Sequence, residues 1–76
     1  MKQDEFKDKK LGKYRHYKGG EYILEAIATH SDTLVQMCIY RAIYGEKSLW
    51  VKEARFFFDE LEYEGKRVVR FTYLGE

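Results

Sequence analysis

The densest group of side chains that could bind a ligand lies between Gly12 and Gly19, in the sequence GKYRHYKG. Tyrosine rings stack on flat ligands, and lysine and arginine hold phosphate or carboxylate groups. Successive side chains of a strand alternate between two faces, so one side of the cluster from Arg15 to Lys18 reaches the surface whatever its register. This segment therefore predicts a contact surface rather than catalytic machinery.

Aromatic and basic residues recur farther along the chain, near the ends of the predicted strands. We expect a small barrel to bring them onto one wall, where aromatic faces stack bases and cations hold phosphates. A peptide is the alternative ligand, because Tyr, Trp and Arg also dominate protein contact sites. The candidate ligand-binding residues are Arg15, His16, Tyr17, Lys18, His30, Tyr40, Arg41, Tyr44, Trp50, Lys52 and Arg70.

Core packing competes with ligand binding for the aromatic residues taken singly. Large rings bury much area each, which makes a core viable in a chain of 76 residues. We therefore favour the core for five of them, with Lys and Arg side chains extending along its rim. These five are Tyr14, Tyr22, Trp50, Phe57 and Phe71.

The histidines and the cysteine form no recognisable metal or catalytic pattern. His16, His30 and Cys38 could meet across neighbouring strands, but their spacing lacks the paired ligands typical of zinc sites. Cys38 lies in a hydrophobic run and is expected to be buried and inert. Ser31 and Asp32 follow His30, yet adjacent residues of one turn cannot converge as a catalytic triad. We predict no catalytic residues, no metal and no cofactor; the less favoured alternative is a small-molecule enzyme whose catalytic groups would come from His16, His30 and Tyr40.

The composition indicates one small domain with balanced charge. The chain has 14 basic and 13 acidic residues, a net charge of +1, which is not the strongly basic balance of a typical nucleic-acid binder. A single cysteine, Cys38, excludes an internal disulfide and favours a reducing, cytoplasmic location. No apolar run approaches membrane-spanning length. We expect residues 1–10 to be a flexible charged segment and residues 11–76 to be one β-barrel domain.

Alternating apolar residues and intervening turn residues predict short strands over residues 14–18, 21–29, 34–41, 48–52 and 67–74. In the second strand, the period of two places Tyr22, Leu24, Ala26 and Ala28 on the inward face. A helix is the competing assignment there. Near residues 54–61 the pattern fits a short helical or irregular segment.

Short strands joined by tight turns predict a mainly β protein that forms a small antiparallel barrel. Closure of a barrel removes exposed sheet edges, which suits a chain with such β-prone strands. The alternative is an α+β sheet in which residues 21–29 or 55–61 form a helix.

A series of motifs follows one order along the chain. The motifs are Gly12-x-Tyr14-Arg15-His16-Tyr17-Lys18-Gly19, Tyr22, Ala28-x-His30-Ser31, Tyr40-Arg41-x-x-Tyr44-Gly45, Leu49-Trp50-Val51-Lys52, Phe57 and Arg70-Phe71. The series covers residues 12–73 and resembles a small bacterial family known as domain of unknown function 1653. The resemblance implies a mostly β, SH3-like domain with no assigned activity.

The chain departs from the usual pattern of that family after Trp-Val, where arginine and then proline are the rule. Lys52 and Glu53 stand at these positions. Because lysine is a point charge, a role that needs a forked guanidinium at position 52 is not expected.

These observations together favour a non-enzymatic binding module. The expected partner is single-stranded nucleic acid, either RNA or single-stranded DNA, or a ribonucleoprotein surface, bound through an aromatic and basic wall. The alternative is a protein–protein interaction or regulatory domain that binds a peptide segment. No membrane partner is expected.

Overall fold

Short extended segments separated by turns account for most of the chain in the computed structural model, which describes residue 6 and residues 8–76. The elements are β1 (Gly12–His16), β2 (Glu21–Thr29), β3 (Gln36–Ala42), β4 (Leu49–Glu53), α1 (Ala54–Phe57), β5 (Glu60–Tyr63), β6 (Lys66–Val69) and β7 (Phe71–Gly75). The protein is therefore mainly β, as the sequence predicts. The expected strand over residues 21–29 coincides with β2, which excludes a helix there.

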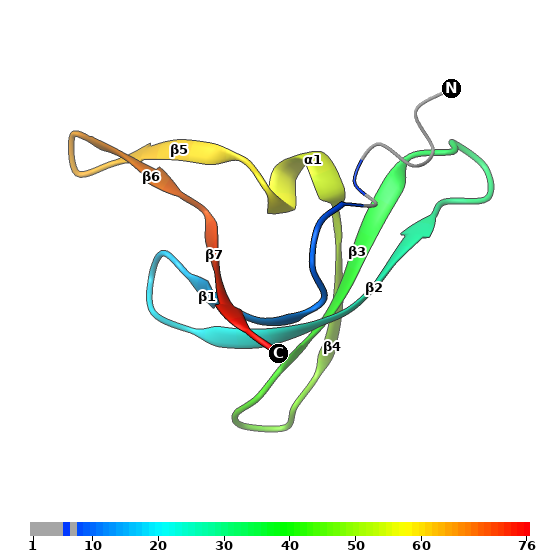
Figure 1. Ribbon diagram of the computed structural model, residues 1–76, viewed down its shortest axis with the longest axis horizontal. Coiled ribbons are helices and arrows are strands. Elements are labelled where there is room, and N and C mark those ends of the chain that lie inside the picture. Colours follow the sequence, from blue (N-terminus) through cyan, green and yellow to red (C-terminus); the bar gives the residue numbers. More distant parts are fainter. Residues whose placement is uncertain (1–5, 7) are drawn as a thin grey trace.

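The strands form two antiparallel sheets (Figure 1). The larger sheet has the order β4-β3-β2-β1-β7, and β5 and β6 form a separate hairpin. Figure 1 shows the larger sheet curling around α1, with the β5–β6 hairpin projecting beside it. Among the described strands, no pairing joins the hairpin to β4, so two sheets are observed rather than one closed barrel.

The predicted strand over residues 67–74 is divided in two, which corrects the sequence-based assignment. The chain bends at Arg70, whose backbone N–H donates to the Asp59 carbonyl at 3.0 Å. The Arg70 carbonyl in turn accepts the Tyr17 N–H at 2.9 Å. These two hydrogen bonds fix the bend at which the chain leaves the β5–β6 hairpin and enters β7, at the edge of the larger sheet.

The segment predicted to be helical or irregular forms the single helical turn α1, while residues 60 and 61 belong to β5 instead. The turn is held by its packing, because a helix of four residues has no independent stability. Its Ala54 and Phe57 are fully buried. Phe57 stacks on Phe71, with ring centroids 4.0 Å apart and planes 5° from parallel.

A β-bulge corrects the predicted inward face of β2. The pairing with β3 shifts by one residue between Leu24 and Ala26, so strict alternation ends there. Leu24 is buried and faces Tyr40, but the next residue packed against the core is Ile27, opposite Cys38. Ala26 and Ala28 were expected to face inward, and the bulge turns them to the other face.

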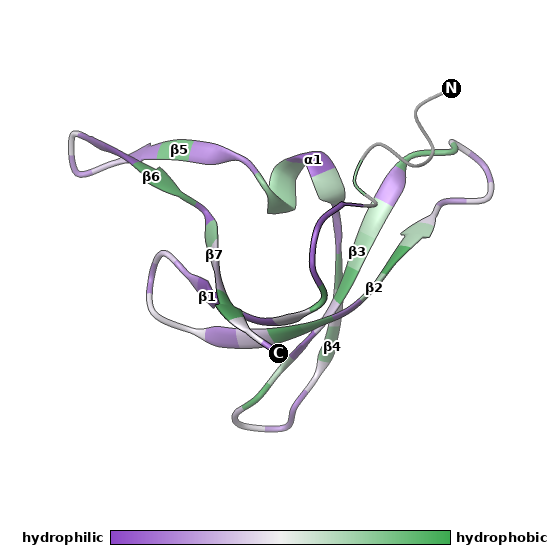
Figure 2. Cartoon of the chain, in the orientation of Figure 1, coloured by the Kyte–Doolittle hydropathy of each residue, from purple (hydrophilic) through white to green (hydrophobic). Residues whose placement is uncertain are grey.

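The core lies between α1 and the sheet. Its buried members are Tyr14, Leu24, Cys38, Tyr40, Ala54, Phe57 and Phe71. Figure 2 shows hydrophobic residues on α1 and along β2 and β3, the elements that supply much of this core. Aromatic rings fill most of it, and edge-to-face contacts between them add to the gain from burial.

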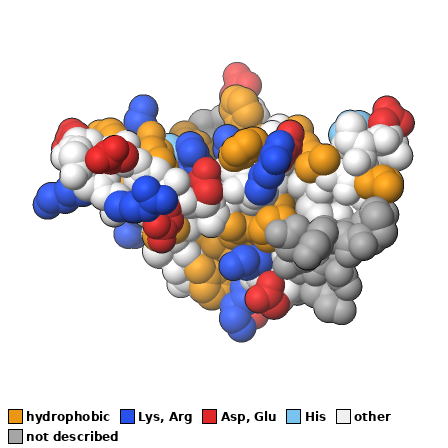
Figure 3. All heavy atoms as spheres, turned by 90° about the horizontal axis from the view of Figure 1, so that it is seen from above, with side chains coloured by type: hydrophobic (Ala, Val, Ile, Leu, Met, Phe, Trp, Pro, Cys, Tyr) orange, Lys and Arg blue, Asp and Glu red, His pale blue; other side chains and the backbone are white. Residues whose placement is uncertain are grey.

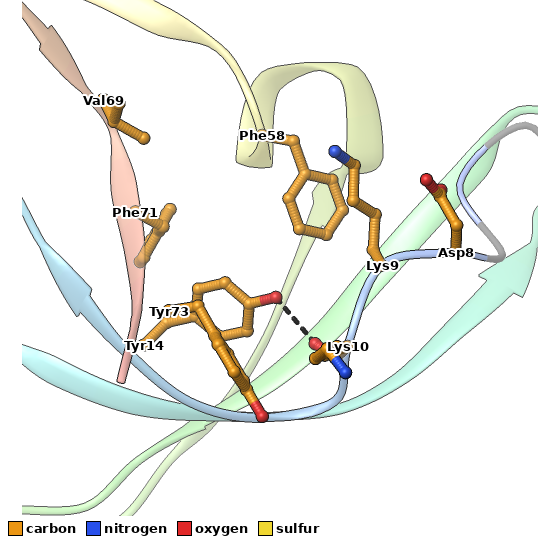
Figure 4. A pocket seen from close by; sticks show the side chains of 8 residues that line it. All are labelled: Asp8, Lys9, Lys10, Tyr14, Phe58, Val69, Phe71 and Tyr73. Atoms are coloured by element: carbon orange, nitrogen blue, oxygen red, sulfur yellow. Dashed lines mark hydrogen bonds between the residues drawn. The ribbon is translucent and has the colours of Figure 1, made fainter. Parts of the chain in front are cut away.

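Part of the expected N-terminal segment, residues 1–5 and 7, lies outside the described residues. The described remainder packs near α1. The Phe6 ring stacks on Phe58 at 5.6 Å, and the Lys9 amine lies 5.3 Å from the Phe58 centroid. The Tyr14 hydroxyl donates to the Lys10 carbonyl at 2.6 Å (Figure 4).

No helix among the described residues is long and apolar enough to cross a membrane.

Candidate ligand-binding surface

Strand pairing determines which candidate residues share a face. Directly opposed residues of an antiparallel pair point to the same side of a sheet. Trp50 is opposite the buried Tyr40, and Lys52 is opposite the buried Cys38. Trp50 and Lys52 therefore lie on the side of the sheet that carries the core, which we call the inner face. Trp50 is nevertheless 54% exposed, because it lies on the edge strand β4.

An open hollow of about 230 Å³, the aromatic pocket, lies at the β3–β4 end of the inner face. It is lined by Tyr22, Ala42, Tyr44, Gly45, Glu46, Lys47, Ser48 and Trp50. The Tyr22 and Tyr44 hydroxyls are 3.0 Å apart and share a hydrogen bond. This bond, together with burial, raises the pKa of Tyr22 to about 12. A side chain at Gly20 would place its Cβ 2.9 Å from the Tyr44 hydroxyl, so glycine there leaves room for the tyrosine pair.

A second feature of the inner face is a group of cations around His16. Burial lowers the pKa of His16, and the nearby charges of Arg70, Lys18 and Lys52 lower it further. We call His16, Tyr17, Lys18, Lys52 and Arg70 the His16 cluster. A neutral imidazole surrounded by cations marks a local positive potential, which favours an anionic ligand.

The hydrogen bonds of His16 fix the position of its proton. The Lys18 backbone N–H donates to Nδ1 at 3.1 Å, so the neutral ring carries its hydrogen on Nε2. Nε2 is thereby a hydrogen-bond donor. The ring is held between Tyr17 and Phe71, with centroid distances of 4.5 and 5.0 Å.

The cations of the cluster differ in how far they are neutralised. Arg70 donates to both carboxylate oxygens of Asp59, at 2.7 and 3.2 Å, and this pairing raises its pKa. Lys18 and Lys52 enter none of the ion pairs found within the described part of the chain. The two lysines are therefore the cations best placed to meet a ligand.

Phe71 connects the aromatic pocket with the His16 cluster. Its ring centroid lies 5.0 Å from His16, 5.9 Å from Tyr22 and 5.6 Å from Tyr40. Tyr40 is only 8% exposed, and burial raises its pKa, so this candidate supports the surface from the core instead of contacting a ligand. The two features thus adjoin on one face.

Other candidates lie elsewhere, so the expected single wall is split. Arg15 and Arg41 point to the outer face, where they pair with Glu21 at 3.2 Å and Glu25 at 2.8 Å. Strand alternation is the reason, because each arginine follows a core residue directly. His30 begins the β2–β3 turn.

His30 has a local structural role in that turn. Its Nδ1 accepts the backbone N–H of Asp32 at 3.1 Å and of Thr33 at 3.3 Å. His16 is near the other end of β2, where Arg15 is opposite Glu21. The two histidines therefore do not meet. No group of three or more His, Cys, Asp or Glu that could hold a metal occurs in residues 6 and 8–76.

Cys38 is fully buried, as expected from its place within a hydrophobic run. Burial raises the pKa of its thiol to about 12, so the reactive thiolate is strongly disfavoured.

Sequence reasoning missed a second hollow of about 300 Å³, shown in Figure 4. Its lining is Asp8, Lys9, Lys10, Tyr14, Phe58, Val69, Phe71 and Tyr73. These residues come from both ends of the chain, and no local spacing could have joined them. It also missed Tyr22 as a pocket wall. The pair Gly19-Gly20 before it was a usable sign, since glycine often marks close approach by a neighbouring group.

Charge is mixed on the face of the molecule that Figure 3 shows. Figure 3 shows Lys and Arg side chains beside Asp and Glu side chains, with hydrophobic side chains reaching the surface between them. Any attraction for an anionic ligand must therefore come from the local arrangement of charges around His16.

Comparisons with known proteins bear on the fold. Residues 12–73 match a family described as protein of unknown function (DUF1653). A crystal structure of a DUF1653 protein from Bordetella bronchiseptica is similar over 92% of both chains, with a TM-score of 0.84 and 25% sequence identity. No curated protein matches the chain.

Proposed function

Since this chain belongs to the DUF1653 family, whose function is unknown, we propose a function from its own surface: a non-enzymatic module that binds single-stranded nucleic acid on the inner face. One observation carries the proposal. Lys18 and Lys52, which have no ion-pair partner among the described residues and whose charges act on His16, adjoin a pocket walled by the exposed rings of Trp50 and Tyr44. Stacking rings next to phosphate-binding cations are the combination that single strands require.

Each group has a chemical role in this proposal. Trp50 and Tyr44 stack bases, which any base permits because every base has a π face. Lys18 and Lys52 hold phosphate oxygens, and His16 donates from Nε2 to another. Arg70 is already held by Asp59 and mainly keeps the potential positive. Such contacts recognise a strand without specifying its sequence.

The small net charge is compatible with a modest affinity. At +1, the whole molecule contributes little long-range attraction for a polyanion. Binding then depends on a few phosphate contacts, so the logarithm of the binding constant should fall by about 0.7 per contact for each decade of salt.

The same proposal includes a finer description of the fold as a partly open SH3-like barrel in a cytoplasmic protein. The support is the order of elements: four strands, a single helical turn, the β5–β6 hairpin, and a last strand that returns to pair with β1. The single buried thiol, Cys38, suits a reducing compartment.

The test is an amide NMR titration with short single-stranded RNA and DNA, run at low and at moderate salt. We expect shifts at Lys18, Tyr44 and Trp50 that weaken as salt rises. Trp50→Ala should weaken binding by about 1–3 kcal/mol, the value of one stacked base. Phe56→Ala is the matched control, because Phe56 is also an exposed aromatic residue, at 45% against 54% for Trp50, but lies on α1 beneath Arg55.

A second pair of variants tests the phosphate contacts. Lys52→Ala should weaken binding and flatten the salt dependence, whereas Lys13→Ala, on the outer face, should change neither. Absence of shifts at high protein and oligonucleotide concentration would reject the nucleic-acid proposal. Salt-insensitive binding of a peptide, lost in Trp50→Ala but kept in Lys52→Ala, would favour the interaction-domain alternative.

A further inference from the structure

Strand β4 is an edge of the larger sheet, and its side chains are unusually apolar and exposed for that position. Leu49 is 51% exposed, Trp50 54% and Val51 61%. Soluble proteins normally blunt such edges with proline, bulges or several charges. The chain contains no proline, and the described pairing of β4 with β3 has no bulge. Among the described strands, none pairs with the side of β4 that faces away from β3, so this edge can accept another strand.

The backbone groups that β4 offers follow from its pairing with β3. The Ala42 N–H donates to the Ser48 carbonyl at 3.1 Å, which makes these residues a hydrogen-bonded pair. Because consecutive residues of a strand direct their backbone groups to opposite sides, those of Leu49, Val51 and Glu53 point away from β3. Leu49 and Val51 offer both N–H and C=O. Glu53 offers only its N–H, because Glu53 is the N-cap residue of α1 and its C=O accepts the first hydrogen bond of the helix.

The side chains of β4 are complementary to a second copy of the same strand. An antiparallel pairing with Val51 on a two-fold axis places Val51 opposite itself and Leu49 opposite Glu53. Trp50 then lies opposite Lys52 of the partner strand, twice, and a lysine amine over an indole face is attractive. These two positions are of the non-hydrogen-bonded kind, where opposed side chains come closest.

Other registers are less favourable. A two-fold axis at Lys52 would set lysine against lysine, which is repulsive. An axis at Trp50 would leave the backbone of Glu53 unpaired. The register centred on Val51 uses all five residues of β4 and opposes no like charges.

We propose that β4 pairs antiparallel with β4 of a second copy of this chain, so that the protein forms a two-fold dimer with one continuous sheet. This proposal rests on the backbone and sequence of β4 and not on the proposed function. Pairing of this type would also bring the inner faces of the two copies side by side at Trp50 and Lys52.

The first test measures mass against concentration by sedimentation equilibrium or by chromatography with light scattering. The wild-type chain should pass from monomer to dimer as concentration rises. Val51→Lys sets two charges face to face on the axis and should raise the dissociation constant at least about tenfold. Thr72→Lys is the matched control, because it adds the same charge to an exposed position of the other edge strand, β7, and should leave dimerisation unchanged.

A disulfide trap tests the register even if Val51→Lys fails to fold. The Cα atoms of a hydrogen-bonded antiparallel pair are about 5.5 Å apart, within the range of a disulfide. Val51→Cys should therefore yield a covalent dimer under mild oxidation, while Thr72→Cys should not. The native thiol of Cys38 is buried and should not interfere.

Two results would overturn the proposal. One is a wild-type chain that stays monomeric at the highest concentration reached. The other is equal cross-linking of Val51→Cys and Thr72→Cys, which would show that contact at β4 is no more frequent than chance collision. If Trp50→Ala weakens oligonucleotide binding while Val51→Lys binds like the wild-type chain, nucleic-acid binding does not depend on the dimer. The two proposals then stand or fall separately.

Discussion

At the scale of single residues, His16 responds most directly to its surroundings. Burial lowers its pKa below the ordinary 6.5, and Arg70, Lys18 and Lys52 act in the same direction. The ring is a neutral donor at neutral pH, next to two lysines that lack partners among the described ion pairs. An anion placed between these cations would therefore raise the pKa of His16.

The lowered pKa of His16 has a consequence for stability. Between the folded pKa and 6.5, the unfolded chain binds more protons than the folded one, so stability falls as the pH drops through this window. We expect His16→Gln to reduce that fall, because glutamine keeps an acceptor for the Lys18 N–H but does not titrate. The free energy of urea unfolding at neutral and at mildly acidic pH measures the effect.

The control for this prediction is His30→Gln. His30 is exposed and accepts backbone bonds in the β2–β3 turn, so this variant replaces the other histidine of the chain and leaves the surroundings of His16 unchanged. An unchanged pH dependence in His16→Gln would contradict the prediction, as would an equal change in both variants.

At the scale of elements, α1 shows how neighbouring identical residues acquire different roles. Phe56 and Phe57 are adjacent, but Phe56 is exposed beneath Arg55 while Phe57 is fully buried against Phe71 and Tyr40. The single turn directs one ring outward and the next into the core. The burial of Phe57 therefore holds α1 in place, because a single helical turn has no independent stability.

This difference predicts unequal costs of truncation. Phe57→Ala should cost about 3–5 kcal/mol of unfolding free energy, because it leaves a cavity between the sheet and α1. Phe56→Ala should cost within about 0.5 kcal/mol, the usual range for surface changes. Urea or thermal unfolding followed by circular dichroism measures both. Similar losses in the two variants would show that Phe57 is not the residue that anchors α1.

At the scale of the whole molecule, the core is small and its one thiol reports on its integrity. A domain of this size has a stability of about 3–5 kcal/mol. Cys38 lies on β3, an interior strand of the larger sheet, and is fully buried, which raises the pKa of its thiol to about 12. Reaction of this thiol therefore requires opening of the core.

We expect Cys38 to react with a thiol reagent about two to four orders of magnitude more slowly in the native protein than in urea, since each 1.4 kcal/mol is about tenfold. Absorbance of the released chromophore follows the reaction. Phe56→Ala should keep this protection, and Phe57→Ala should lose most of it. A native rate equal to the rate in urea would show that Cys38 is accessible without unfolding.

The sequence by itself determined the local features of this protein. The β class and the extent of β2 follow from apolar periodicity, β-branched and aromatic residues, and turn residues, all of which act over a few positions. The burial of Cys38 followed in the same way from its hydrophobic neighbours. The motif order from Gly12 to Phe71 also sufficed to place the chain in its family.

Only the tertiary structure decided how these features combine. The bulge after Leu24 reversed the faces of half of β2, and the bend at Arg70 depends on Asp59, eleven residues away in sequence. Strand pairing then sent Arg15 and Arg41 to the outer face and placed Lys52 of β4 where its charge acts on His16 of β1. Local sequence patterns do not predict strand register or long-range contacts, because both arise from packing between segments that are distant along the chain.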